Sequence, residues 1–144
     1  MAIISQTAAN VGVGSLTATT RILQVGEAVT QGQPGYRSAT DSKYYQADAN
    51  DGAEKADVVC IFLTPASTNG YSLALIAPPS GAISNLVDLG ATLAVGTAYY
   101  LSNTKGAIQL ESDLVTNDWV TFLGIAKTTA LLDFQPRATG VQKP

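Results

Sequence analysis

The chain has 144 residues, enough for one domain with a sizeable hydrophobic core. Only 13% of the residues are charged and the net charge is −3, so the surface is weakly charged for a soluble domain. The eight basic residues are scattered along the chain, which excludes the basic face that nucleic-acid binding requires. Low surface charge favours association with partners or with copies of the same chain, although a small secreted β domain has a similar composition.

Residues 1–20 are uncharged, rich in small side chains and without a helical period. They are predicted to be an extended N-terminal arm that becomes ordered against another surface, or a flexible tail. The segment has neither a basic start nor a continuous apolar core, so it is not predicted to be a secretion signal. The apolar runs elsewhere are too short to span a membrane. We therefore expect synthesis in a cytoplasm and no membrane association.

Residues 21–136 are predicted to form a single β domain, followed by a C-terminal tail over residues 137–144. Short runs of β-branched and aromatic residues recur roughly every 8–12 residues between turn signals, the spacing typical of a sandwich or barrel. The predicted strands are RILQV (21–25), VVCIFL (58–63), YSLALI (71–76), AYYLS (98–102), AIQL (107–110), WVTFLGIA (119–126) and ALLDF (130–134). Residues 47–58 and 84–90 could each form a turn or two of helix, but neither has the periodicity of a core helix.

Two stretches have nearly the same layout: GQPGYRSATDSKYYQ (32–46) and GTAYYLSNTKGAIQL (96–110). Each reads as a hairpin with a polar turn, and each is followed by an acidic loop, an apolar strand, a turn and another strand. The pattern repeats at a period of about 64 residues. The sequence thus predicts an all-β, compact β-sandwich or barrel, jelly-roll-like, built from two pseudo-repeated hairpin units that close one core.

The residue types argue against catalysis. The chain contains no His, which excludes Ser-His-Asp and Cys-His nucleophiles and removes the usual zinc ligands. Cys60 lies inside an apolar run and is predicted to be a buried hydrophobe. The glycine-rich VGVGS (11–15) lacks the lysine and preceding strand of a phosphate-binding loop. We expect no enzyme activity and no cofactor, with hydrolysis by paired carboxylates as a remote alternative.

The acidic residues between Asp48 and Asp57 raise the question of a calcium site. An EF-hand loop that begins at Asp48 fits positions 1 and 3 of that motif but fails at positions 5, 6 and 12. A solvated loop is the favoured interpretation. No metal is predicted.

The tyrosine pairs Tyr44–Tyr45 and Tyr99–Tyr100 lie in predicted strands, where neighbouring side chains point to opposite faces. One ring of each pair should point inward and the other outward. An outward ring could contact a partner protein, since tyrosine is favoured in interfaces, or could cover the flank of its own hairpin.

From Gly90 onward, the rhythm of Gly-x-x-Tyr-Tyr-Leu-Ser, Gly-x-Ile, an acidic loop and Val-x-x-Leu-Gly-x-Ala resembles a module of tailed-bacteriophage virion proteins. Together with VTQGQPGYRSATDSKYYQADAND, residues 25–136 resemble the small capsid decoration (cement) proteins of such phages. The motifs that carry the resemblance are structural and include no catalytic signature. Tail-fibre and baseplate proteins use the C-terminal module as well.

The resemblance implies a homo-oligomer, a dimer or trimer, on the exterior of the virion capsid, where it stabilises contacts between subunits of the major capsid protein. The alternative it leaves open is a fibre or baseplate module that recognises host carbohydrate. The uncharged arm could pair with the sheet edge of a neighbour. The candidate partner-contact residues are Ile3, Ile4, Val11, Val13, Leu16, Tyr45 and Tyr99.

Overall fold

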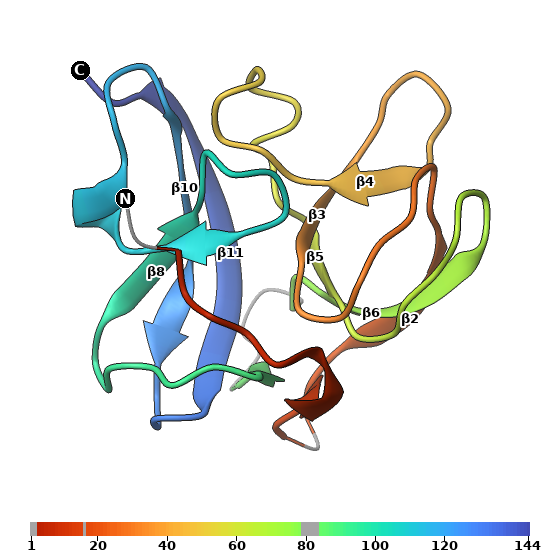
Figure 1. Cartoon of the computed structure of the whole chain (residues 1–144), viewed down its shortest axis with the longest axis horizontal. Helices are drawn as coiled ribbons and strands as arrows, with labels where there is room; N and C mark the ends of the chain where they lie inside the picture. The colour runs from red at the N-terminus through yellow and green to blue at the C-terminus, as the bar shows by residue number, and fades with distance from the viewer. Residues whose placement is uncertain (1–2, 16, 79–83) are drawn as a thin grey trace.

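The structure of the chain is a computed structural model that describes residues 3–15, 17–78 and 84–144. Within these residues the strands form two antiparallel sheets packed against each other (Figure 1), which confirms the prediction of a compact all-β sandwich. The only helical segments described are the short 3-10 turns η1 (Ala8–Asn10) and η2 (Glu111–Asp113). No helix in the described part of the chain is long and apolar enough to cross a membrane.

The first half of the chain forms a five-stranded sheet, here called sheet B, with the strand order β2-β6-β5-β3-β4. Its strands are β2 (Thr20–Gln24), β3 (Pro34–Arg37), β4 (Tyr44–Gln46), β5 (Cys60–Phe62) and β6 (Tyr71–Ile76). Sheet A has six strands in the order β1-β7-β11-β10-β8-β9. Its strands are β1 (Val11–Val13), β7 (Leu86–Leu89), β8 (Ala98–Leu101), β9 (Ile108–Gln109), β10 (Trp119–Ala126) and β11 (Leu131–Gln142).

The two sheets share one strand order. Strands β2 to β6 are arranged as β2-β6-β5-β3-β4, and β7 to β11 as β7-β11-β10-β8-β9, with β1 added beside β7. Both predicted hairpins are present, as β3–β4 and β8–β9. This is the layout that two repeated units would produce, although an internal repeat itself stays a prediction. Apart from β1, each sheet takes consecutive strands from one half of the chain, which differs from the jelly-roll winding expected from the sequence.

Two hydrophobic clusters explain why β5 is apolar along its whole length. Ile61 points into the main core between the sheets, whereas Cys60 and Phe62 point into a smaller core enclosed by the curled sheet B. All three side chains are buried. A strand covered on both faces needs no polar alternation, and this accounts for the continuous run VVCIFL.

Three segments differ from the sequence-based expectation. Residues 86–89, where a helical turn was considered, form strand β7. Residues 47–58 contain turns but no helix. Residues 137–142, predicted to be a tail, continue β11 beside β10, and the amide of Lys143 donates to the carbonyl oxygen of Asp118 at 2.8 Å. Local propensity misses such segments because their partners are distant in the sequence.

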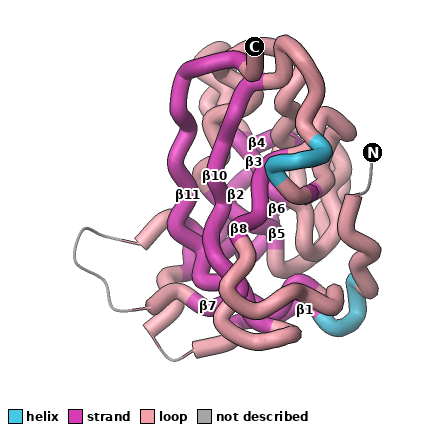
Figure 2. The backbone as a smooth tube through the Cα atoms, turned by 90° about the vertical axis from the view of Figure 1, so that its left-hand side faces the viewer, coloured by secondary structure: helices cyan, strands magenta, loops and turns pink. Residues whose placement is uncertain are grey.

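The predicted N-terminal arm lies on the body of its own chain. We call residues 3–13 the N-terminal strap. In Figure 1 the strap crosses in front of sheet A, and Figure 2 shows it passing through η1 into β1 at the sheet edge. β1 pairs with β7 in antiparallel register. The main-chain N–H and C=O groups of an extended segment need hydrogen-bond partners, and the edge of sheet A supplies them within the same chain.

Candidate interaction surfaces

The strap joins the two outer edges of sheet A. At its start, Ile3 forms an isolated antiparallel bridge with Gln109 of β9, and the amide of Ile4 donates to the carbonyl oxygen of Ile108 at 2.9 Å. At its end, Val11–Val13 pair with β7. The strap therefore occupies the gap between β7 and β9 with main-chain hydrogen bonds at both ends.

The side chain of Gln6 connects the strap to both halves of the molecule. Its Nε2 donates to the carbonyl oxygen of Gly32, which precedes β3, at 2.9 Å and to that of Leu89 in β7 at 3.0 Å. Gly32 has a φ of +86°, and a side chain there would lie 2.5 Å from the Gln6 amide. The backbone conformation favours glycine here, and a larger residue would also push the Gln6 amide away from its two hydrogen bonds.

The predicted contact residues of the strap divide into two groups. Ile3 and Val13 are exposed, with 45% and 48% of their surface accessible. Ile4 and Val11 are partly buried and pack against the main core. Leu16 lies outside the described residues. Only Ile3 and Val13 among the described members of the strap set present an open apolar surface to a partner.

Neighbouring tyrosines point to opposite faces in both pairs, but only Tyr99–Tyr100 has one buried ring and one outer ring. Tyr44 and Tyr45 are both partly buried, Tyr44 against the smaller core and Tyr45 against the main core. Tyr99, a candidate contact residue, is only 4% exposed, and its hydroxyl oxygen accepts a hydrogen bond from the amide of Ala94 at 2.9 Å. Tyr99 is therefore a core residue, which removes it from the surface set. Its neighbour Tyr100 lies on the outer face of sheet A. The sequence does not show which of the two side chains faces the core, because both residues are tyrosine.

Tyr45 lies at the surface and partly covers its own hairpin. Its ring stacks on Tyr36 with a centroid distance of 5.8 Å, and its hydroxyl donates to Oδ2 of Asp41 at 2.5 Å. Gly26 lies under the ring, where any side chain would overlap it. This contact favours a structural role for the hairpin, while part of the ring stays available to a partner.

The hydrogen bond between Tyr45 and Asp41 predicts a pH dependence. It raises the pKa of Tyr45 to about 12 and lowers the pKa of Asp41 below its ordinary value. The stabilisation from Asp41 is present above its unfolded pKa and is lost as the pH falls through its lower folded pKa. That from Tyr45 is present below its unfolded pKa of about 10 and is lost as the pH rises through its folded pKa.

The Tyr45→Phe variant should move the pKa of Asp41 back towards its ordinary value, measured by NMR titration of the carboxyl carbon. The exposed Tyr71, on another strand, supplies the control variant Tyr71→Phe, which should leave the Asp41 titration unchanged. Equal Asp41 curves in the wild type and in Tyr45→Phe would contradict the interaction.

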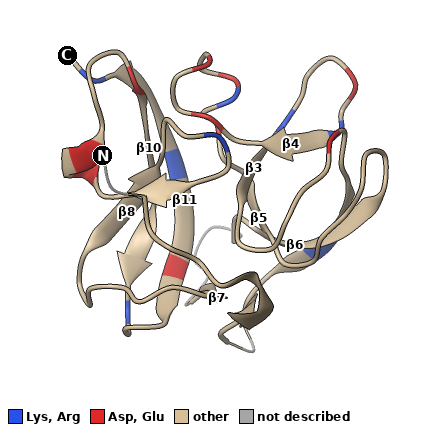
Figure 3. Cartoon of the chain, viewed as in Figure 1, with Lys and Arg blue, Asp and Glu red and all other residues tan. Residues whose placement is uncertain are grey.

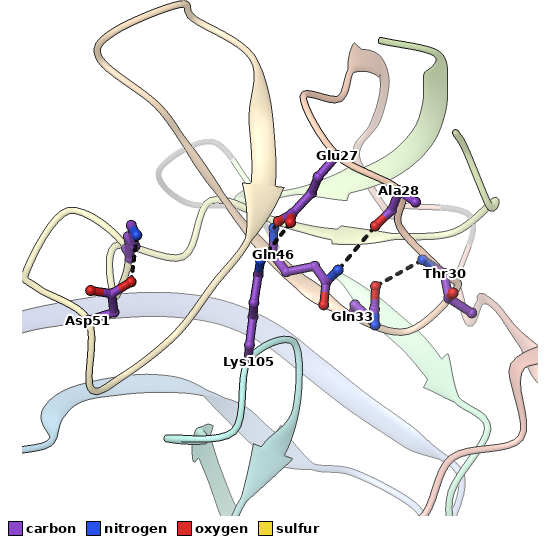
Figure 4. A network of polar contacts seen from close by, with 8 residues as sticks. Glu27, Ala28, Thr30, Gln33, Gln46, Asp51 and Lys105 are labelled. Atoms are coloured by element: carbon purple, nitrogen blue, oxygen red, sulfur yellow. Dashed lines mark hydrogen bonds and ion pairs between the residues drawn. The ribbon is translucent and has the colours of Figure 1, made fainter. Parts of the chain in front are cut away.

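The two similar hairpins meet at a polar seam between the sheets (Figure 4). Lys105 in the turn between β8 and β9 forms an ion pair with Glu27 at 2.6 Å. The same carboxylate accepts a hydrogen bond from the main-chain amide of Gln46 at 2.8 Å. The amide of Gly106 donates to the carbonyl oxygen of Ala47 at 2.8 Å. An exposed ion pair contributes about 1 kcal/mol or less, so the main-chain contacts fix the seam. Its role is architectural.

The outer face of sheet A carries a shallow groove of about 640 Å³. Tyr100 of β8 and Phe122 of β10 form its floor in an edge-to-face pair with a centroid distance of 5.8 Å, and Ile125 extends it. Asp133 and Arg137 of β11 line its polar side. In the described part of the chain Arg137 forms no ion pair, so its guanidinium is free to meet a partner. The sequence did not reveal this surface because Phe122 lies in the apolar run 119–126, which does not show by itself which side chains face outward.

A second exposed apolar area lies across β2 and β6 of sheet B. Ile22 and Leu73 are directly opposed in the strand register, with exposed fractions of 68% and 38%, and Tyr71 on β6 is 65% exposed. The alternation of YSLALI predicts that Tyr71 and Leu73 share a face, and the structure places that face partly in solvent. Most charged residues lie in the loops (Figure 3), but Asp133 and Arg137 are on β11 and line the groove together with Lys127.

The groups available for chemistry are few. Cys60 is completely buried, and burial raises the pKa of its thiol, which opposes reactivity. Among residues 3–15, 17–78 and 84–144, no group of three or more His, Cys, Asp or Glu side chains is placed to hold a metal ion. In the acidic loop, Asp51 pairs with Lys55 and Asp48 accepts a hydrogen bond from the amide of Asn50. These are contacts of a solvated turn.

Comparison of the chain with protein-family models, with curated proteins and with solved structures found no match in any of the three.

Proposed function

We propose that this chain is a capsid decoration (cement) protein, a structural virion component without enzyme activity. It is synthesised in the host cytoplasm and binds the exterior of the assembled capsid. There it stabilises contacts between subunits of the major capsid protein and acts as a homo-oligomer, a dimer or trimer. It uses no cofactor and contacts neither nucleic acid nor membrane.

The observation that carries this proposal is the groove on sheet A. An apolar aromatic floor beside a free arginine is the composition found at the centre of protein interfaces, where tyrosine, phenylalanine and arginine are enriched. The groove lies on β8, β10 and β11, whose inner side chains are fixed in the main core. A rigid sheet face of this kind can dock on a neighbouring protein without a large ordering cost.

The test is sedimentation of the purified chain with empty shells assembled from the major capsid protein of the same genome. The wild-type chain should pellet with the shells and raise the temperature at which they dissociate. Tyr100→Ala, in the groove, should bind the shells about tenfold or more weakly, since truncation of a central aromatic residue costs about 1–2 kcal/mol or more. Ile22→Ala, in the other exposed apolar area, is the matched control and should bind as the wild type does.

A wild-type chain that stays in the supernatant would contradict the proposal.

The second candidate is a fibre or baseplate module that binds host carbohydrate. It is favoured by the position of Tyr100 and Phe122 beside the carboxylate of Asp133, since sugar sites combine ring faces with polar groups. Binding of the wild-type chain to a glycan array, lost in Tyr100→Ala but not in Ile22→Ala, would support that candidate instead.

A further inference from the structure

The two sheets close in different ways. In sheet B the strand ends meet directly: Val25, after β2, bridges Tyr44 of β4, and the amide of Gly26 donates to the carbonyl oxygen of Tyr44 at 2.9 Å. By the shared strand order, β7 and β9 are the corresponding strands of sheet A. Within the described residues β7 and β9 do not pair with each other, and the strap lies between them. Sheet A therefore contains a strand-accepting gap that sheet B lacks.

The gap is shaped to receive an extended chain. The amide of Thr7 donates to the carbonyl oxygen of Gly90 at 2.6 Å. Gly90 has a φ of +68°, and a side chain there would overlap the Thr7 carbonyl oxygen. With Gly32 under Gln6, two glycines of the body leave room for the strap. The body of the molecule therefore leaves room for an extended main chain in this gap and offers it a main-chain hydrogen-bond acceptor.

The strap is held mainly by hydrogen bonds and is only lightly packed. None of the residues 3–13 is fully buried. A hollow of about 670 Å³ lies beside it, lined by Ser5, Thr7 and Asn10 on the strap side and by Asp88 and Thr92 on the body side. Segments with few buried apolar contacts open at low free-energy cost compared with global unfolding. The strap therefore has the small number of buried contacts that permits local opening.

We propose that the strap is exchanged between copies, so that residues 3–13 of one chain fill the β7–β9 gap of a second chain. The occupant is a second copy because the gap already fits this segment, through main-chain pairing and the two acceptors of Gln6. Exchange of an identical segment keeps the contacts of residues 3–13, which makes it a low-cost route to oligomers. The contacts of the linker between β1 and β2 with its own body must open, among them the hydrogen bond from the Gly14 amide to the Leu86 carbonyl oxygen and that from the Thr19 amide to Oδ1 of Asn85. The six residues between β1 and β2 can extend to about 20 Å, enough to reach a neighbour in contact.

This inference deepens the homo-oligomer part of the proposed function and assigns it a structural basis. It applies to the isolated protein, whether or not a capsid is present. Failure of the two proposals can therefore be told apart: exchange without capsid binding would overturn only the proposed function, and capsid binding by a chain that does not exchange would overturn only this inference.

The test uses two single-cysteine additions on opposite sides of the β1–β7 pair. Gly12 and Asp88 are register partners, and a side chain at Gly12 meets open space. Opposed residues of an antiparallel pair have Cα atoms about 4.5–5.5 Å apart, within the range of a disulfide. Gly12→Cys and Asp88→Cys chains, one of them carrying a size tag, are mixed, co-refolded from urea and oxidised. The native Cys60 is buried and should not react.

The matched control is a mixture of Ile22→Cys and Leu73→Cys chains, which are register partners inside sheet B and exposed. Exchange predicts a covalent heterodimer from the strap mixture in about tenfold or greater excess over the control mixture. The double variant Gly12→Cys/Asp88→Cys checks that the pair can form a disulfide at all. The inference is wrong if the double variant forms its disulfide only within one chain and the mixture of Gly12→Cys and Asp88→Cys chains yields no more heterodimer than the control mixture. The strap then stays on its own chain.

Discussion

Gly90→Ala is expected to detach the strap and to lower the free energy of unfolding. The conformation at Gly90 alone costs a non-glycine residue about 1–3 kcal/mol. In addition, the new methyl group overlaps the Thr7 carbonyl oxygen. The strap must therefore shift, and the hydrogen bond from the Thr7 amide to Gly90 is lost. Urea unfolding gives the free energy, and hydrogen exchange at the amides of Ile4 and Thr7 gives the state of the strap.

Gly140→Ala is the matched control for this prediction. Gly140 has a φ of +69°, almost the value at Gly90, but a side chain there meets open space. The two variants pay the same conformational cost, so the difference between them reports the overlap with the strap. Equal losses of stability, with unchanged exchange at Ile4 and Thr7, would show that the strap does not depend on Gly90.

Phe62→Ala is expected to cost about 3–5 kcal/mol of folding free energy, the largest effect of any substitution considered. Phe62 is completely buried and is the largest side chain of the small core inside sheet B. Its loss leaves a cavity that the short strands β3 and β5 can close only in part. Sheet A and the main core lie on the other face of sheet B, so the damage should be centred on the first half of the chain. Urea unfolding measures the size of the effect, and amide exchange measures its place.

The neighbouring Gly35 makes this prediction sharper. A methyl group at Gly35 would lie 2.6 Å from Cζ of Phe62, so Gly35→Ala should itself destabilise the wild type by about 1–3 kcal/mol. In the Phe62→Ala background the ring is gone and the same methyl group fills part of the cavity, while its contact with Sγ of Cys60, at 2.8 Å, is still too close. The double variant should therefore be more stable than the sum of the two losses predicts, by about 1 kcal/mol. Strict additivity would show that the two residues do not compete for the same space.

Much of the fold follows from local patterns. The strand at 71–76, the hairpins at 32–46 and 96–110, and the burial of Cys60 were all predicted, because each depends on alternation, turn residues or a short apolar run. The strand β7 was missed because LVDL is too short for its alternation to be distinctive, and the strand is stabilised by β1 and β11 on either side. The candidate site was predicted least well. Tyr99 is buried, and the groove with Tyr100 in its floor was not predicted.

The sequence by itself determined the all-β class, the positions of most strands and the absence of histidine-based chemistry, since these depend on composition and on neighbours within a few residues. Only the tertiary structure decided the role of residues 3–13. An uncharged, unpatterned segment is compatible with a free arm, and nothing local shows that β7 and β9 leave a gap for it. That gap exists because sheet A, unlike sheet B, does not close on itself. The main-chain hydrogen bonds that hold the strap in the gap join residues far apart in the sequence. Such bonds do not depend on side-chain identity, so no sequence pattern indicates them.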